Sequence, residues 1–179
     1  ANARLGKTQR LSALHLVDEL PPGAAGEIVG RSAAMMDGYH CRAEQTRAAE
    51  WRDAEGRRYI RTGDIGRFDA DGFLTLVGRA KDMIISGGFN IYPSDIEAVL
   101  VGHPDVVEAA VVGAPSEQWG ETPVGVVVAS GDAEAIRAWA NARLGKTQRL
   151  SALHLVDELP RNAIGKVLKR ELREALGIA

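Results

Sequence analysis

The sequence predicts an α+β fold, in which a β-rich first part precedes a small unit with a short mixed sheet flanked by helices. Two observations support this. Glycine, aspartate and short β-prone runs dominate as far as Gly78, as in a chain of short strands and tight turns. Helical and strand patterns then alternate to the end of the chain. The character changes near residues 79–82, so we divide the chain into residues 1–21, 22–80 and 81–179.

The first part is expected to consist of strands with one short helix. A turn at Pro21-Pro22-Gly23 comes first, and an Asp-Ala-Asp-Gly turn at Asp69–Gly72 separates the last two strands. Strands are predicted over residues 27–29, 59–60 and 73–77, and the helix over residues 45–51.

In the second part, a glycine pair and a helix start are the clearest local signals. Gly87-Gly88 between two apolar runs indicates a hairpin over residues 83–92. Pro93 and the acidic residues that follow favour the start of a helix over 93–101, which Gly102-His103-Pro104 ends. The remaining predicted elements are strands over 106–112, 122–128 and 151–159 and helices over 132–144 and 167–176.

Composition excludes several classes of function. The chain has 179 residues, 45% of them hydrophobic and 26% charged, with a formal net charge of −2. This balance gives no basic surface for nucleic acid and fits a soluble globular protein. A lone cysteine, Cys41, cannot form an internal disulfide. No apolar run is long enough to span a membrane, and the N-terminus has no signal-peptide pattern, so a cytoplasmic location is expected.

One segment occurs twice without any change. Residues Ala1–Pro21, ANARLGKTQRLSALHLVDELP, recur as Ala140–Pro160. Ancient repeats occur in several copies that have drifted apart, so a recent or artificial duplication is the preferred origin. The first copy includes a strand pattern at SALHLVDEL. We expect it either to replace a missing neighbouring strand or to drive a swapped dimer.

Three motifs occur in a fixed order, and together they are specific. They are YIRTGD at 59–64, GRAKD at 78–82 and PRNAIGK at 160–166, with GGFNIYP at 87–93 between the last two. The chain from about residue 22 to 176 closely resembles the C-terminal third of the AMP-forming acyl-CoA synthetases, in the adenylate-forming superfamily. By this resemblance residues 22–80 are the β-rich end of a large adenylating domain, and residues 81–179 are a mobile C-terminal domain.

The resemblance implies a ligase that works in two steps. A carboxylate attacks the α-phosphate of ATP to give an acyl-adenylate and pyrophosphate, and the thiol of CoA then displaces AMP. The implied cofactors of the complete enzyme are ATP, Mg²⁺ and CoA. The implied partners are the large N-terminal domain of the same enzyme and a small carboxylic acid. A fragment of this length is expected to be inactive alone, and fatty, aryl and dicarboxylic acids all remain open as substrates.

The resemblance assigns three residues to nucleotide chemistry. Lys166 corresponds to the catalytic lysine of adenylation, since a flexible cation in a mobile loop can neutralise charge on the phosphate. Asp64 corresponds to the aspartate that accepts hydrogen bonds from the ribose hydroxyls, and Arg79 to an arginine that also contacts the ribose. The alternatives are a solvated lysine like Lys169, a turn aspartate and a surface salt bridge.

Three further residues are assigned to movement and to CoA. Lys81 occupies the hinge position, where a change in backbone dihedral angles would swing the C-terminal domain. Gly87 and Gly88 match the loop that lines the pantetheine tunnel, because glycine lets the backbone approach a ligand closely. A tight turn is the alternative for this pair. No metal-binding residues are assigned.

Two other functions remain open on the sequence. One is an adenylation domain that serves a carrier protein instead of free CoA. The other is an inactive folding or domain-swapping module. The isolated chain is expected to release no AMP from ATP. Release of AMP when a large domain is added would distinguish an enzyme from such a module.

Overall fold

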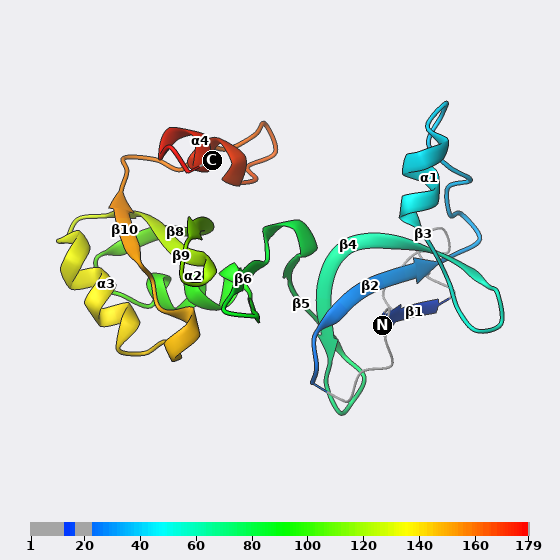
Figure 1. The fold of residues 1–179 in the computed structure, drawn as a ribbon, viewed down its shortest axis with the longest axis horizontal. Helices are drawn as coiled ribbons and strands as arrows, with labels where there is room; N and C mark the ends of the chain where they lie inside the picture. The colour runs from blue at the N-terminus through cyan, green and yellow to red at the C-terminus, as the bar shows by residue number, and fades with distance from the viewer. Residues whose placement is uncertain (1–12, 17–22, 179) are drawn as a thin grey trace. The chain divides into compact units, whose positions relative to one another are not determined.

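The computed structural model describes residues 13–16 and 23–178, with side chains from residue 23 onward. The chain divides into two units between Lys81 and Asp82 (Figure 1). Each unit contains a sheet, and the second also contains most of the helical residues described. The α+β prediction is confirmed. In the part of the chain that the structure describes, no helix is long and apolar enough to cross a membrane.

Unit 1 is a sheet with the strand order β1-β2-β4-β3, and β5 pairs with β4. Its core is formed by apolar residues from the central strands, Ile28, Val29, Tyr59, Ile65 and Val77. The elements are β1 (Ala13–Leu16), β2 (Gly26–Arg31), α1 (Ala43–Ala49), β3 (Glu50–Arg52), β4 (Arg58–Phe68) and β5 (Leu74–Arg79), followed by a 3₁₀ turn, η2 (Ala80–Asp82).

Two predictions for unit 1 need correction. The helix ends at Ala49, and Trp51 lies in β3, where it pairs with Tyr59 of β4. The two rings meet edge to face at 5.2 Å, so this cross-strand contact overrides the local helical pattern. The strand expected over residues 59–60 extends from Arg58 to Phe68 because it pairs with three neighbouring strands.

The duplicated segment contributes a strand in each unit. In the first copy, β1 pairs antiparallel with β2. In the second copy the same four residues form β10, Ala152–Leu155, which pairs parallel with β9. The position of β1 beside β2 is consistent with its replacing a neighbouring strand. The rest of the first copy and the predicted turn at Pro21-Pro22 lie outside the described residues.

Unit 2 is a mixed sheet with the order β10-β9-β6-β7, and β8 pairs with β9. Alternate residues of β8 and β9 face opposite sides. Val111 and Val127 lie in one apolar core with residues of α2 and α3, whereas Val112 and Val126 lie in another with Leu172 of α4. The elements are β6 (Ile84–Ser86), β7 (Phe89–Ile91), α2 (Pro93–Val101), β8 (Val106–Ser116), β9 (Gly120–Ala129), α3 (Ala133–Asn141), η3 (Lys146–Gln148), β10 and α4 (Lys169–Ala175).

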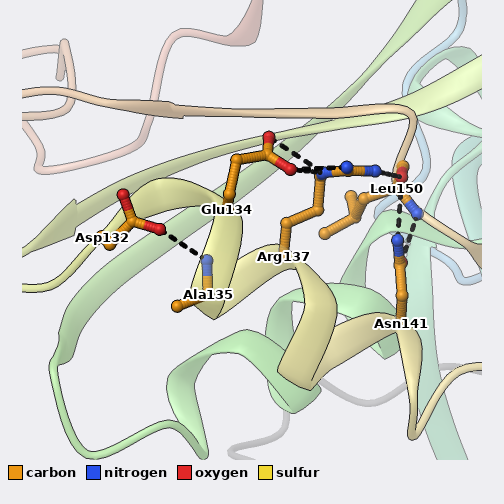
Figure 2. A network of polar contacts seen from close by, with 6 residues as sticks. All are labelled: Asp132, Glu134, Ala135, Arg137, Asn141 and Leu150. Atoms are coloured by element: carbon orange, nitrogen blue, oxygen red, sulfur yellow. Dashed lines mark hydrogen bonds and ion pairs between the residues drawn. The ribbon is translucent and has the colours of Figure 1, made fainter.

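Helix α3 is shorter than predicted because its side chains close both ends. Asp132 caps the start by accepting the N–H of Ala135 at 2.8 Å. At the other end Asn141 donates to the carbonyl of Leu150 at 3.0 Å and accepts its N–H at 2.7 Å. Figure 2 shows this network together with Arg137, which bonds both Glu134 and the Leu150 carbonyl. The amide contacts hold the following loop against the end of the helix.

Two other predicted elements are shorter in the structure. Strand β10 ends at Leu155, four residues before the predicted end, after which Val156 donates one last backbone hydrogen bond to Val127. Helix α4 begins at Lys169, two residues later than predicted, because Val167 and Leu168 return along the turn that carries Lys166.

Candidate functional site

Asp64 and Arg79 form an ion pair in unit 1. They lie directly opposite each other on β4 and β5, and Asp64 Oδ1 is 2.9 Å from Arg79 Nε. That nitrogen is not aligned for a hydrogen bond, so the contact is electrostatic. Asp64 is thus a strand residue, and the turn-aspartate alternative is wrong. Both side chains are more than one third exposed, which leaves room for a ligand beside the pair.

A bulge in β4 turns Asp64 toward the arginine. Gly63 has a φ of 70°, in the left-handed region that favours glycine. Thr62 braces the bulge, because its hydroxyl donates to the Ile28 carbonyl at 2.8 Å and accepts the N–H of Asp64 at 3.1 Å. Each of the three residues of the Thr-Gly-Asp motif therefore has a local structural role at this bulge.

The hairpin of β6 and β7 turns at the glycine pair. Gly87 and Gly88 have φ values of 57° and 82°, as a two-residue turn with positive φ at both positions requires. Gly87 also donates its N–H to the carbonyl of Trp119 at 2.8 Å. A Cβ at Gly87 would lie 2.8 Å from Cε3 of that ring, so close contact excludes a side chain there. No pattern in the sequence singles out Trp119.

Lys166 closes a hydrogen-bonded turn between Pro160 and Leu168. Its N–H donates to Oδ1 of Asn162 at 2.9 Å, and its carbonyl accepts the N–H of Asn162 at 3.0 Å. Lys166 therefore lies in a turn that is closed by its own hydrogen bonds. The Lys166 side chain is exposed and has no ion-pair partner among residues 23–178.

Lys169 is not the solvated lysine that its sequence context indicates. Its ammonium lies 2.7 Å from Oε1 of Glu97, and only 23% of its side chain is exposed. The same carboxylate oxygen accepts the N–H of Val111 at 2.9 Å. This contact joins α2, β8 and α4, so Lys169 has a structural role in unit 2.

The structure distributes the predicted residues over both units. Asp64, Arg79 and Lys81 belong to unit 1, and Lys81 is the last residue before the division. Gly87, Gly88 and Lys166 belong to unit 2. Within the residues described, no group of three or more His, Cys, Asp and Glu side chains is placed to hold a metal ion.

Comparison with known proteins identifies the relatives of this chain. Residues 95–166 match the family model of the AMP-binding enzyme C-terminal domain. A 2-succinylbenzoate–CoA ligase from Geobacillus kaustophilus is 45% identical over 159 residues, which are 87% of this chain and 31% of that protein. The chain thus spans about a third of the length of the curated relatives it matches.

Two solved structures have the same fold. ATP-bound MatB from Rhodopseudomonas palustris is 34% identical with a TM-score of 0.83, covering 91% of this chain and 33% of that one. The o-succinylbenzoate CoA synthetase of Bacillus subtilis, in complex with an acyl-adenylate intermediate, is 33% identical with a TM-score of 0.77, covering 90% and 33%. The chain carries an AMP-binding enzyme C-terminal domain, and its homologues are CoA ligases of the adenylate-forming superfamily.

Proposed function

We propose that this chain supplies the catalytic lysine, the hinge and one wall of the thiol channel to an ATP-dependent acid–thiol ligase. In the first step a carboxylate oxygen attacks the α-phosphorus of ATP, and pyrophosphate leaves. In the second step the sulfur of CoA attacks the acyl carbonyl, and AMP leaves with the bonding electrons. The observation that carries the proposal is Lys166, an exposed cation with no ion-pair partner within residues 23–178, held at the end of a closed turn.

Each proposed residue has a task that its chemistry suits. The ammonium of Lys166 would neutralise charge that develops on the phosphate. The first step needs no proton transfer, because a carboxylate is already a nucleophile. The free oxygen of Asp64 would accept a hydrogen bond from a ribose hydroxyl, while Arg79 holds the other oxygen.

The glycine hairpin and the hinge would serve the second step. At Gly88 no atom lies within 4 Å of the place where a side chain would begin, so the backbone there is open to an extended pantetheine arm, whereas the ring of Trp119 covers that space at Gly87. Lys81 lies at the end of unit 1, where a change in backbone dihedral angles would reorient the two units. We therefore place adenylation and thioester formation in two arrangements of the same chain.

A two-part assay tests the proposal. The 179-residue chain is mixed with the portion of a 2-succinylbenzoate–CoA ligase that precedes the region matched here, and pyrophosphate release from ATP and 2-succinylbenzoate is measured. We expect no release from the chain alone and release from the mixture. The matched control adds the ligase's own C-terminal portion instead. If that control is active and the mixture is not, the proposed function is wrong.

Thioester formation in the same mixture shows which thiol accepts the acyl group. Thioester formation with free CoA supports the acyl-CoA ligase. Formation with a carrier-protein thiol and not with CoA would identify the chain as part of an adenylation domain.

A further inference from the structure

The turn that carries Lys166 has a close counterpart in unit 1. Residues 161–166 read RNAIGK, and residues 52–57 read RDAEGR. In both, the backbone of the second residue exchanges hydrogen bonds with the fifth and sixth. Asp53 donates to Arg57 at 3.2 Å and accepts from Gly56 at 2.9 Å, and the matching distances in the Lys166 turn are 3.0 and 2.9 Å.

The glycine and the first arginine also correspond. Gly56 and Gly165 have φ values of 76° and 80°. Arg52 donates from Nη1 to the carbonyl of Gly56 at 3.1 Å, and Arg161 donates in the same way to Gly165 at 2.6 Å. The two segments are therefore the same turn in different units, one joining β3 to β4 and the other closed by an isolated bridge between Arg161 and Val167.

One side-chain oxygen holds each turn closed. Oδ1 of Asp53 accepts the N–H groups of Glu55 and Arg57 at 3.1 and 2.8 Å. Oδ1 of Asn162 accepts the two N–H groups at the same positions in its own turn, at 3.2 and 2.9 Å, the second of them from Lys166. The amide oxygen of Asn162 and the carboxylate oxygen of Asp53 thus accept the same two backbone hydrogen bonds.

A third turn shows that the closing hydrogen bonds form without a charged residue at the last position. Asp69 accepts from Asp71 and Phe73 at 3.0 and 2.8 Å, and Gly72 has a φ of 79°. This turn ends in an uncharged residue and closes in the same way. The closing oxygen therefore does not depend on a cation at the sixth position.

The two cationic turns differ in their acidic side chains, because Asp53 and Glu55 both bind the guanidinium of Arg57, whereas Asn162 and Ile164 stand at these positions beside Lys166. Oδ2 of Asp53 accepts from Nε of Arg57 at 2.6 Å, and this hydrogen bond raises the pKa of the guanidinium. Asn162 has an NH₂ group in place of that oxygen, and an NH₂ group donates and cannot bind a cation. The arginine is bound by its own turn, whereas Lys166 has no such partner.

We propose that Asn162 is a positioning residue that fixes the backbone of Lys166 and leaves its ammonium uncompensated. A carboxylate at this position would hold the turn equally well, but it would bind the cation as Asp53 binds Arg57. It would also place negative charge beside a site that is to receive phosphate. The use of the free ammonium in catalysis rests on the proposed function, whereas the effect of Asn162 on the lysine does not.

The test uses the 179-residue chain and two readouts of Lys166. One is hydrogen exchange of its backbone N–H, followed by NMR. The other is the rate at which limiting N-acetoxysuccinimide acetylates its amine at pH 8, measured by mass spectrometry relative to exposed Lys81, whose sequence context occurs only once in the chain. The variants are Asn162→Asp and Asn162→Ala, with Asp53→Asn in the counterpart turn as the matched control.

We expect the two substitutions to separate the two roles. Asn162→Asp should keep the N–H exchange within about twofold but slow acetylation about two- to fivefold, because an exposed ion pair holds the amine protonated. Asn162→Ala should accelerate exchange by about tenfold and leave acetylation within about twofold, because only the hydrogen bond is lost. Asp53→Asn should change neither. Unchanged acetylation in Asn162→Asp, or unchanged exchange in Asn162→Ala, would overturn the inference.

The two-part assay then connects the inference to catalysis. Asn162→Asp should lower the kcat of pyrophosphate release several-fold with little change in the KM for the carboxylate. If Lys166→Ala leaves the release intact, the proposed function fails, and the exchange and acetylation results still judge the role of Asn162. If Lys166→Ala abolishes release but Asn162→Asp has full activity, the catalytic role of Asn162 is wrong.

Discussion

Two lysines three residues apart are held in opposite ways. Lys169 is half-buried, and its ammonium bonds a carboxylate that also accepts a backbone N–H of β8. The turn before it holds Lys166 by the backbone and leaves the side chain exposed. The comparison shows that one basic segment can contain a cation that stabilises the fold and another that stays available for a ligand.

The largest expected effect is on activity at the free lysine. Lys166→Ala should lower pyrophosphate release in the two-part assay by at least about 10²-fold, because one well-placed electrostatic donor is lost. Its urea unfolding midpoint should match that of the unchanged chain. A loss of release below about threefold would remove the distinction between the two lysines.

Lys169→Met should have the opposite profile. It leaves a partly buried carboxylate without its cation, so the free energy of unfolding should fall by about 1–3 kcal/mol in urea titrations. Arg170→Met is the matched control in the same helix. Arg170 pairs with Glu174 at 3.7 Å with both side chains mostly exposed, so its loss should cost less than about 1 kcal/mol. Equal losses would mean that burial does not separate the two pairs.

The smallest expected effect is a pH dependence in the counterpart turn. Burial works to raise the pKa of Asp53, but hydrogen bonds from Arg57 outweigh it and lower the pKa below the ordinary value of 3.8. A lowered pKa stabilises the fold above the ordinary value, and this contribution is lost as the pH falls through the lower value. Asp53→Asn has no such carboxylate.

Urea midpoints between pH 5 and pH 2.5 measure this contribution. The unchanged chain should be more stable than Asp53→Asn at pH 5, and the difference should shrink as the pH falls below the ordinary aspartate value. A difference that stays constant over this range would show that the carboxylate is not held by Arg57 in solution.

Local patterns predicted elements where a few neighbouring residues decide the backbone. The helix from Pro93 to Val101 has its predicted bounds, and the glycine pair turns the predicted hairpin. Predictions were less successful where distant residues decide. Trp51 belongs to a strand because it packs on Tyr59, and Lys169 is paired because Glu97 lies beside it in the fold.

The duplicated segment separates these two kinds of information most directly. The tetrapeptide Ala-Leu-His-Leu is a strand in both copies, so its alternating apolar pattern is sufficient to specify extended backbone. The pattern does not specify which strand the tetrapeptide pairs with or in which direction. Leu14 lies opposite Gly30 in an antiparallel pair, and Leu153 lies opposite Gly125 in a parallel pair.

The sequence by itself determined that these residues form strands, that glycine closes the turns, and which family the motifs resemble. The tertiary structure decided the direction of each strand, the partner of Lys169 and the absence of an ion-pair partner for Lys166 within residues 23–178. The physical reason is that backbone preferences act between near neighbours in the chain. Pairing and charge compensation instead depend on groups that only folding brings within a few ångströms.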